Sequence, residues 1–485
     1  MMARTDGPAM ASPSLHETLE QIKDVVGPGG WLSDERDIAP YLSEQRGLYH
    51  GSTRLVVRPA NTREVSAVLA LCSRARLAVI PQGGNTGLCG AGVPPADGQN
   101  IVLSLSRMRA IRSIDPGNFT IIVDAGCILA DVQRAAAEHD RLFPLSLGAE
   151  GSCQIGGNLS TNAGGIQVLR YGNMRELTLG LEIVLADGRV LDCLRTLRKD
   201  NTGYDLKQLF IGAEGTLGII TGAALRLFPK PVATVTAYVS VPTLGSIISL
   251  LSLSREKTGD QLTAFEFMPR FGVDIAVRHV HDVHDPLPGT ADWYVLMELS
   301  SSVNDGHLEA MLESLLAAAL EAGLIADAAI AANEKQRAAM WRVREALVEA
   351  QKFEGASIKF DVSVPVTSIP EFVEEAARAC LAIVPSARPL AFGHCGDGNV
   401  HFNLAAPVGD DGGFVDWTPA LNTAVFDMVG KYRGSISAEH GIGLTKREAL
   451  GTYKSGTELD IMRAVKAALD PLNILNPDKV IPAPS

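Results

Sequence analysis

The sequence predicts an α+β fold divided into more than one domain. The chain has 485 residues, which exceeds the size at which one hydrophobic core keeps growing. Apolar residues make up 46% and charged residues 20% of it, an ordinary globular composition. Short β-branched runs alternate with longer helical patterns without a fixed repeat, so we expect sheets covered by helices.

The first half combines short strands with glycine-rich turns. A helix is expected over residues 16–26. A strand over 53–59, a helix over 62–76 and a strand over 77–80 follow in a βαβ-like order, which stops at the glycine-rich run 81–92. Further strands are expected over 101–105, 120–124, 181–186 and 217–221.

The run Phe228-Pro229-Lys230-Pro231 is the strongest predicted domain boundary, because proline ends regular structure. Beyond it, strands are expected over 233–241, 263–267, 293–299 and 357–364, and helices over 243–256, 306–322, 333–351 and 370–382. We therefore predict domains over 1–230 and 231–430 and a C-terminal segment, 431–485, that completes the active site.

Charge and hydropathy exclude several classes of partner. The formal net charge is −12 and the sequence pI is about 5.4, which disfavours binding to nucleic acid. No uninterrupted apolar stretch reaches the roughly 18 residues of a membrane span. Residues 1–14 contain no apolar signal region, so a cytoplasmic location is expected.

The cysteines do not indicate a disulfide framework. There are seven, an odd number, and no two are spaced as Cys-x-x-Cys. This pattern favours reduced, mostly buried side chains over disulfides or a thiolate zinc site.

Three glycine-rich loops indicate a phosphate-bearing ligand. They cover 81–87, 148–165 and 212–218, and Asn and Thr are enriched among their residues. Adjacent glycines let backbone N–H groups approach an anion closely. None matches G-x-G-x-x-G between a strand and a helix, which disfavours NAD. One such cluster is more often a tight turn, whereas three favour a long nucleotide lying over several loops.

The sequence His394-Cys395-Gly396-Asp397-Gly398-Asn399-Val400-His401 indicates a metal site. If Asp397-Gly398 forms a two-residue hairpin turn, His394 and His401 become directly opposed and their rings converge. Asn403 then points to the same face. The alternative is that both histidines are satisfied polar side chains near a turn.

A third ligand is expected from Glu439, which lies beside His440 and glycines that permit close approach. Two histidines and one carboxylate leave a coordination position open, which is typical of a catalytic zinc site. Mn²⁺ and Fe²⁺ suit the same nitrogen and oxygen donors.

Two cations in the second half of the chain are candidate functional residues. Arg344 lies within an apolar stripe of the predicted helix 337–351, and a buried guanidinium needs a partner. Lys359 lies on the polar face of the strand 357–364. Structural salt bridges are the alternative explanation for both. The apolar stripe comprises Met340, Trp341, Leu347 and Val348.

Five motifs resemble the FAD-linked D-2-hydroxy-acid dehydrogenases of the vanillyl-alcohol-oxidase-like flavoprotein superfamily. They are PQGGNTGLCGAG, GSCQIGGNLSTNAGGIQVLRYGN, LADGRVLDCLRTLRKDNTGYDLKQLFIGAEGTLGIIT, GHCGDGNVHFNL and SAEHGIGLTKRE. The similarity runs from about residue 40 to the C-terminus, and the long central motif is most similar to the D-2-hydroxyglutarate dehydrogenases.

The resemblance implies a two-subdomain FAD-binding domain of the vanillyl-alcohol-oxidase type, an α+β substrate domain and a C-terminal helical segment. Some members attach the flavin through a histidine in the first loop, but Gln82 and Asn85 flank the glycines here, so we expect non-covalent FAD. The FAD contacts that it implies are Pro81, Gly83, Gly84, Asn85, Thr86, Gly87, Gly156, Thr161, Asn162, Gly165, Glu214, Gly218 and Ile220.

The resemblance also assigns roles in the active site. His394, His401 and Glu439 match the family's metal ligands, and His440 matches its catalytic base. The positions that match its substrate contacts are Arg344, Lys359, Asn403 and His440. Keeping both cations favours a dicarboxylate, although Val348 stands where the hydroxyglutarate enzymes carry threonine.

The expected reaction is metal-assisted oxidation of D-2-hydroxyglutarate to 2-oxoglutarate. The C2 hydrogen passes as hydride to flavin N5, and the electrons go to an external acceptor such as an electron-transfer flavoprotein or a quinone. A homodimer is expected. The alternatives are a D-lactate or broad D-2-hydroxy-acid dehydrogenase, an oxidase that uses oxygen directly, and a non-catalytic FAD electron-transfer subunit.

Overall fold

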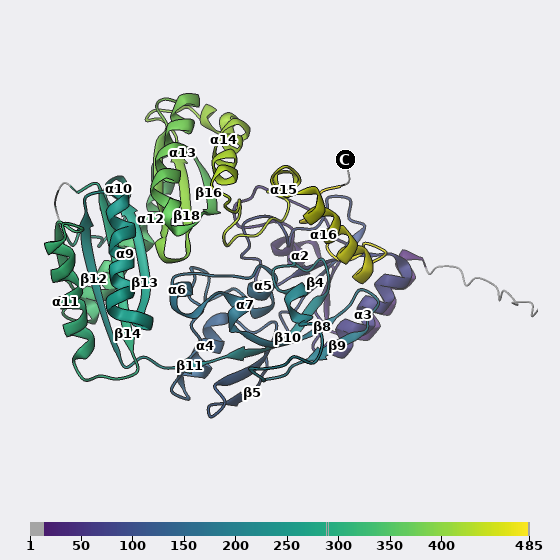
Figure 1. The fold of residues 1–485 in the computed structure, drawn as a ribbon. Helices are drawn as coiled ribbons and strands as arrows, with labels where there is room; N and C mark the ends of the chain where they lie inside the picture. The colour runs from purple at the N-terminus through teal and green to yellow at the C-terminus, as the bar shows by residue number, and fades with distance from the viewer. Residues whose placement is uncertain (1–13, 288, 290, 484–485) are drawn as a thin grey trace, which may run out of the picture.

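The sheets of the protein fall on two sides of the run Phe228–Pro231 (Figure 1). The structure is a computed structural model that describes residues 14–287, 289 and 291–483. The predicted α+β class is confirmed. The prediction that the N-terminus lacks a signal concerns residues 1–14, nearly all of which lie outside the described residues.

A small four-stranded sheet forms the N-terminal layer, in the order β1-β2-β4-β3. β2, β4 and β3 pair in parallel, as the βαβ-like order predicts, and β1 joins β2 antiparallel. A reciprocal hydrogen-bonded cap between Ser14 and Glu17 begins α1. The bounds are α1 Leu15–Val26, β1 Trp31–Leu32, α2 Glu35–Ile38, η1 Ala39–Tyr41, β2 Leu55–Val57, α3 Thr62–Ala75, β3 Ala78–Gln82 and β4 Asn100–Ser104.

A five-stranded antiparallel sheet packs beside it, in the order β5-β6-β10-β8-β9. Its apolar residues and those of the first sheet form one continuous core. The glycine-rich loops begin at the end of β3 and after β7 and α8. The bounds are β5 Ile111–Asp115, β6 Thr120–Asp124, α4 Leu129–Ala137, β7 Arg141–Leu142, α5 Ile155–Ser160, α6 Val168–Tyr171, α7 Met174–Leu177, β8 Thr178–Val184, β9 Val190–Cys193, α8 Lys207–Phe210, β10 Ile219–Arg226 and β11 Phe228–Pro229.

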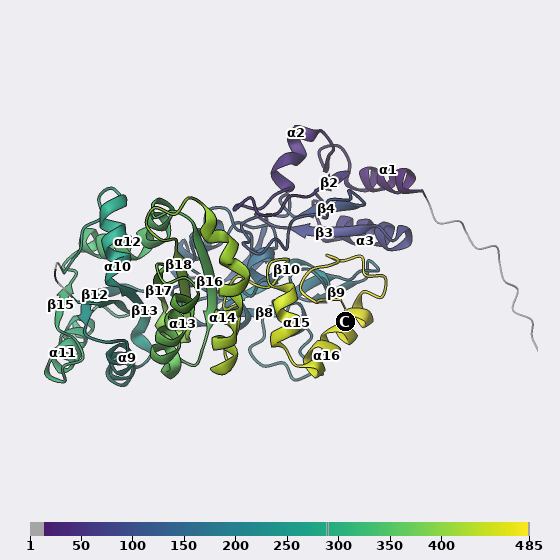
Figure 2. The same ribbon diagram turned by 90° about the horizontal axis from the view of Figure 1, so that it is seen from above.

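A seven-stranded antiparallel sheet follows, in the order β15-β12-β14-β13-β17-β18-β16. Figure 2 shows α9, α11, α13 and α14 along one face and α10 and α12 on the other. The bounds are β12 Ala233–Val241, α9 Leu244–Thr258, β13 Leu262–Pro269, α10 Arg270–His279, β14 Trp293–Ser301, α11 His307–Glu321, β15 Asp327–Ile330, α12 Glu334–Ala350, η3 Gln351–Phe353, β16 Ser357–Ser363, α13 Ile369–Ile383, β17 Arg388–His394, η5 Cys395–Asp397, β18 Asn399–Ala405 and α14 Thr418–Lys431.

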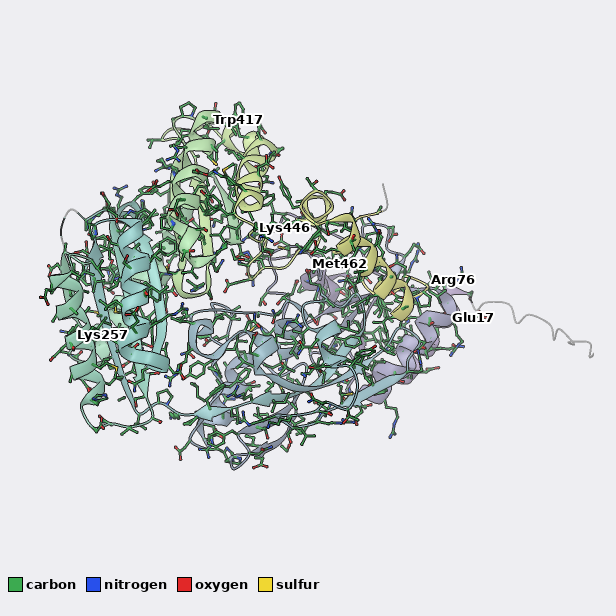
Figure 3. All side chains as sticks on the ribbon, in the orientation of Figure 1. Glu17, Arg76, Lys257, Trp417, Lys446 and Met462 are labelled. Carbon is green, nitrogen blue, oxygen red and sulfur yellow. The ribbon has the colours of Figure 1, made fainter. Side chains whose placement is uncertain are left out.

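After α14 the chain returns to the N-terminal sheets. α15 (Arg447–Tyr453) and α16 (Gly456–Leu469) lie beside them in Figure 1. Beyond α16, Leu475 forms a parallel bridge with Val79 of β3. Lys446, labelled in Figure 3 between the seven-stranded sheet and the N-terminal part, donates from Nζ to the carbonyl oxygen of Asp361 at 3.3 Å. The C-terminal segment therefore contacts both parts of the fold.

The other structural expectations are met in part. All seven cysteines are free and all but Cys193 are buried, as predicted. No helix among the described residues is both long and apolar enough to cross a bilayer. The sequence patterns gave no expectation for α10 or α14.

Candidate active site

A cavity of about 630 Å³ lies among the three glycine-rich loops, the seven-stranded sheet and the C-terminal segment. Its volume is within the range of cofactor and ligand sites. Every residue predicted to contact FAD lines it except Asn162 and Gly165. The structure therefore brings the three loops together, as their composition predicts.

Asn162 and Gly165 shape a loop instead of lining the cavity. Asn162 has a φ of 51°, and its Oδ1 accepts a hydrogen bond from the backbone N–H of Arg175 at 2.9 Å. A Cβ added to Gly165 would lie 1.9 Å from the carbonyl oxygen of Ser146. Both residues hold the second glycine loop in place, and their direct contact with a cofactor stays a prediction.

The lining of the cavity suits a long polar cofactor. Gly84 approaches the chain so closely that an added Cβ would lie 2.0 Å from the carbonyl oxygen of Ser152. The buried atoms Gln154 Oε1 and Asn158 Oδ1 have no hydrogen-bond partner in the described part of the protein. Both residues line the cavity. Buried acceptors are rarely left unpaired, so these oxygens fit a ligand that carries N–H and O–H donors.

The side chains that flank the first glycine pair hold the loop itself. Gln82 Nε2 donates to the carbonyl oxygens of Tyr41 and Gly92 at 3.0 and 2.9 Å. Asn85 Nδ2 donates to that of Ser43 at 2.8 Å. Neither side chain is a nucleophile, which is consistent with a non-covalently bound flavin.

The predicted hairpin forms, but its register differs from the expectation. His401 of β18 pairs with Phe392 of β17, so the prediction that His394 and His401 are directly opposed is wrong. The 3₁₀ turn Cys395–Asp397 followed by Gly398, with a φ of 88°, makes the connection longer than two residues. Because the shift is two residues and side chains alternate, both histidines still face the same side.

The predicted metal ligands lie together. The rings of His394 and His401 have centroids 5.5 Å apart. One donor atom from each of His394, His401 and Glu439 lies within 4.8 Å of the others. Three such donors from a hairpin and a loop suit one divalent ion with an open position. The geometry fits the ligand set; whether a metal binds there stays a prediction.

Glu266 of β13 contacts a histidine of this cluster and orients its ring. Its Oε1 lies 2.7 Å from Nδ1 of His394, and its Oε2 accepts from Nε of Arg344 at 2.9 Å. Burial alone would raise the pKa of Glu266, but the two cationic partners hold it below its usual range. This contact leaves Nε2 of His394 facing Glu439, at 3.8 Å from its Oε1. A carboxylate behind a histidine is a common way to orient a metal ligand.

Asp361 of β16 fixes the loop that carries Glu439 and His440. Its Oδ2 accepts hydrogen bonds from the backbone N–H groups of Glu439 at 2.9 Å and His440 at 2.8 Å. The same oxygen lies 3.5 Å from Nδ1 of His440. Its Oδ1 accepts from Asn399 Nδ2 at 3.0 Å. Despite its burial, the positive groups and N–H donors around Asp361 hold its pKa well below the usual value.

The protonation states of the cluster suit acid–base and metal chemistry. Burial raises the pKa of Glu439 to about 7, even though His394 opposes the shift. Burial lowers the pKa of His440, which favours the neutral imidazole that a general base requires. Burial lowers the pKa of His394 as well, but Glu266 outweighs it and raises the value to about 9. Binding of a metal at Nε2 of His394 would therefore release a proton.

The predicted substrate contacts fall into two groups. Lys359 and His440 line the cavity. Arg344 and Asn403 are buried beside it and do not line it. Arg344 uses Nε for Glu266, and its guanidinium lies 4.8 Å from the centre of the Phe392 ring. Asn403 pairs in register with Lys359 and donates to Gln351 Oε1 at 2.8 Å.

Val348 does not belong to the core stripe of its helix, contrary to the expectation. Its side chain is 52% exposed and lines the cavity, whereas Met340, Trp341 and Leu347 are buried. The next turn carries Lys352, which lines the same cavity. The end of α12 and the following 3₁₀ helix η3 therefore present one apolar and one cationic side chain to the site.

Four residues of the site were not predicted from the sequence. Glu266 carries a signal in retrospect, because an acid interrupts the apolar run Phe265–Met268 of a buried strand. Asp361 alternates with apolar residues in β16. This alternation predicts on which face of the sheet its side chain lies, but it does not predict which residues the carboxylate contacts. Arg46 stands in a turn and Lys352 in the short 3₁₀ helix η3, and neither belongs to a sequence pattern.

Models of two families match most of the chain. The FAD binding domain matches residues 53–194, and the C-terminal domain of FAD linked oxidases matches residues 230–480. An Arabidopsis thaliana protein named mitochondrial D-2-hydroxyglutarate dehydrogenase is 39% identical over 460 residues, covering 95% of this chain and 80% of that protein. A Schizosaccharomyces pombe protein provisionally named mitochondrial D-lactate dehydrogenase is 36% identical, covering 96% and 90%.

A solved structure of p-cresol methylhydroxylase has the same fold. It superimposes with a TM-score of 0.76 at 15% sequence identity, covering 96% of each chain. This likeness shows the fold alone, and it confirms the predicted vanillyl-alcohol-oxidase type. With a matching family model over residues 230–480 and relatives similar over nearly the whole of this chain, the chain belongs to the FAD-linked oxidase family and is an FAD-dependent enzyme of the D-2-hydroxy-acid dehydrogenase type.

Proposed function

We propose that this enzyme oxidises D-2-hydroxyglutarate to 2-oxoglutarate with the help of one divalent metal ion. The observation that carries the proposal is the position of the His394, His401 and Glu439 cluster. It lies beside His440, and His440 lines the same cavity as the FAD loops and Lys359. A metal, a base and a cation for a second carboxylate would then surround one substrate.

FAD is held in this proposal by the three glycine-rich loops. Gly83, Gly84 and Thr86 line the cavity at the first loop, where we place the diphosphate, and Gly156 and Thr161 line it at the second loop. When bound, FAD supplies the chemistry of hydride acceptance at flavin N5, which no amino acid side chain can provide. The protein contributes orientation and exclusion of water.

The metal ligands are His394, His401 and Glu439, and zinc is the first choice because the donors are two imidazoles and one carboxylate. Mn²⁺ and Fe²⁺ suit the same donors. A bound divalent ion lowers the pKa of a ligated hydroxyl group by several units, which assists loss of the alcohol proton.

His440 accepts the hydroxyl proton in this proposal. Burial lowers the pKa of its ring, which favours the neutral form, and Asp361 accepts from its backbone N–H and lies 3.5 Å from its Nδ1. A general base that is oriented by a buried carboxylate is suited to this step. Asn403, Arg344 and Lys359 are proposed to orient the two carboxylate groups of the substrate.

Other parts of the proposal rest on the sequence. We propose the domains 1–230, 231–430 and 431–485, an external acceptor such as an electron-transfer flavoprotein or a quinone, and a homodimer. The two relatives described above are named as mitochondrial proteins. A cytoplasmic location for this chain remains a prediction.

A D-lactate or broad D-2-hydroxy-acid dehydrogenase is the second candidate. The Schizosaccharomyces pombe relative supports it by its name, and Val348 offers the substrate no hydrogen bond. Lys359 favours the diacid, because a monocarboxylate such as D-lactate leaves a cation in the cavity without an anionic partner. A non-catalytic FAD subunit would need neither His440 nor the metal cluster.

Anaerobic bleaching of the flavin band tests the proposal. The purified, metal-loaded protein is mixed with D-2-hydroxyglutarate, L-2-hydroxyglutarate, D-malate and D-lactate in parallel. We expect the fastest bleaching with D-2-hydroxyglutarate. Faster bleaching with D-lactate would support the second candidate, and no bleaching with any of the four acids would support the non-catalytic subunit.

A further inference from the structure

Three cationic side chains line one region of the cavity without an acidic partner. They are Arg46, Lys352 and Lys359, from the segment after η1, from η3 and from β16. None of them lies within 4.0 Å of a carboxylate oxygen in the part of the chain that the structure describes. By surface area all three side chains are exposed, so their charged groups are accessible to an anion that enters the cavity.

The three charges act on one another. Burial lowers the pKa of Lys359, and the charges of Arg46 and Lys352 lower it further. Arg46 also contributes to the lowered pKa of His440, behind burial and Lys446. Arg46 therefore lies near the proposed base as well as near Lys359, although it belongs to the N-terminal part of the chain.

The acids of the cavity do not neutralise this cluster. Glu44, Glu214 and Glu439 are the carboxylates among the lining residues. The carboxylate of Glu44 accepts from the backbone N–H groups of Arg46 and Leu48, both at 2.6 Å. Glu214 accepts from those of Ile442 and Gly443 at 2.7 and 2.9 Å. Glu439 faces His394. Each carboxylate has other donors, and the cluster is left with a net positive charge.

We propose that Arg46 and Lys352 join Lys359 in binding the substrate carboxylate that is farther from the reacting carbon. The inference rests on the proposed function and deepens it, because it makes the enzyme selective for dicarboxylates. Each cation can donate a charged hydrogen bond to the carboxylate, and such bonds are stronger than neutral ones. Three cations therefore bind the carboxylate more tightly than one. Val348 contributes only shape, so charge carries the selectivity.

The position of Arg46 gives this site a second property. Asn85 Nδ2 donates to the carbonyl oxygen of Ser43, which fixes the segment of Arg46 to the first glycine loop. Lys352 and Lys359 belong to the other part of the fold. A diacid bound by all three would therefore connect the two parts across the cavity, whereas a monocarboxylate would not reach the cluster.

The FAD diphosphate is the other anion within the cavity for Arg46 to bind. The following test distinguishes binding of the substrate carboxylate from binding of the diphosphate. Arg46→Gln and Lys352→Gln are compared with Lys335→Gln, which changes an exposed lysine in the first turn of helix α12. Each holoenzyme is reduced anaerobically with D-2-hydroxyglutarate and with its C5 monoamide, which keeps the length and loses the distal charge. The preference is the ratio of the two half-saturating concentrations.

We expect each of the two variants to lower the preference for the diacid by about tenfold, with FAD content equal to that of the wild type. Lys335→Gln should keep the wild-type preference. An unchanged preference in both variants would overturn the proposal. Loss of FAD from Arg46→Gln with an unchanged preference would place Arg46 at the cofactor and overturn its assignment to the substrate.

A binding measurement keeps the test independent of the reaction. Glutarate and butyrate are titrated into each oxidised holoenzyme, and the change in flavin absorbance is followed. Tighter binding of glutarate in the wild type, reduced by about tenfold in Arg46→Gln and Lys352→Gln, supports the cation cluster even if no hydroxy acid reduces the flavin. In that case the proposed function alone fails. Equal binding of the two acids by the wild type overturns the cluster as a dicarboxylate site.

Discussion

Nδ1 of His394 lies 2.7 Å from Oε1 of Glu266, a carboxylate that is wholly buried in the middle of β13. The contact fixes the ring so that its other nitrogen faces His401 and Glu439. The other oxygen of the same carboxylate, Oε2, accepts a hydrogen bond from Nε of Arg344. One buried acid therefore supports both the metal cluster and a proposed substrate contact.

Replacing that acid should weaken metal binding without removing a ligand. Glu266→Gln is expected to lower metal affinity by about 10–100-fold, the usual effect of losing a partner behind a ligand. Competition with a chelator measures it. Glu298→Gln, a buried acid on β14 away from the cluster, serves as the control. Equal affinity in the Glu266→Gln protein and the wild type would contradict the orienting role.

Removing a ligand should have a larger effect. His394→Ala is expected to lose bound metal and most activity while FAD absorbance stays intact, because the FAD loops lie elsewhere in the cavity. Metal content by elemental analysis and turnover are measured together. His307→Ala, an exposed histidine at the start of α11, should match the wild type. Full activity of His394→Ala would refute the metal assignment.

Asp361 is predicted to act through the loop that it holds. In Asp361→Asn one acceptor oxygen remains for the N–H groups of Glu439 and His440, and the amide adds donors that repel them. Small displacements of a base cost about 10²-fold in rate. We expect kcat to fall by about that factor while KM changes less and FAD content stays constant. A rise in KM with an unchanged kcat would argue against this role.

The close approach at Gly84 should make the first loop sensitive to a methyl group. A Cβ at Gly84 would overlap the carbonyl oxygen of Ser152, whereas one at Gly87 meets nothing within 4 Å. Gly84→Ala is therefore expected to lower the thermal midpoint and the FAD content, and Gly87→Ala to keep the midpoint of the wild type. Differential scanning calorimetry decides. Equal midpoints for the two variants would mean that the loop moves freely.

The stability of the fold should depend on the protonation of Glu214. Burial raises its pKa from 4.5 to about 7, against the pull of two backbone N–H donors. The folded protein then binds more protons than the unfolded chain between these values. The stability that this group contributes is present below about pH 4.5 and is lost as pH rises through 7, roughly 2–4 kcal/mol in all.

Glu214→Gln removes that dependence. Urea unfolding of the wild type and the variant at several pH values gives the difference in unfolding free energy. We expect the variant to gain stability relative to the wild type as pH rises from 4.5 to 7. A difference that stays constant over this range would show that Glu214 is ionised in the folded state at low pH.

The sequence predicted the long elements well and the register poorly. Strand 120–124 and the helices 62–76 and 370–382 lie within a residue or two of their predicted bounds, because their apolar period is clear. The hairpin after His394 was misjudged, since Asp-Gly favours a tight turn and the structure uses a longer one around Cys395. The two histidines still lie close together, because side chains alternate between the two faces of a strand and a shift of two residues keeps them on the same face.

The partners of buried charges were beyond prediction for a different reason. Asp361 contacts residues 78 and 79 positions later in the chain, and Glu266 contacts His394 over a separation of 128. Such contacts depend on how strands are ordered in a sheet and on the path of the C-terminal segment. Local periodicity contains neither. The unpaired cations at Arg46 and Lys352 could be recognised only when three distant segments were seen around one cavity.

Because the C-terminal segment returns to the N-terminal sheets, the parts of the active site are completed in a defined order. During synthesis His394 and His401 are made before Glu439, and the three glycine-rich loops precede all of these residues. The loop that carries Glu439 and His440 is held by hydrogen bonds to Asp361 and, at Ile442, to Glu214. A nascent chain can therefore fold its sheets while it lacks the third ligand and the base, so redox chemistry begins only after the two parts have been joined.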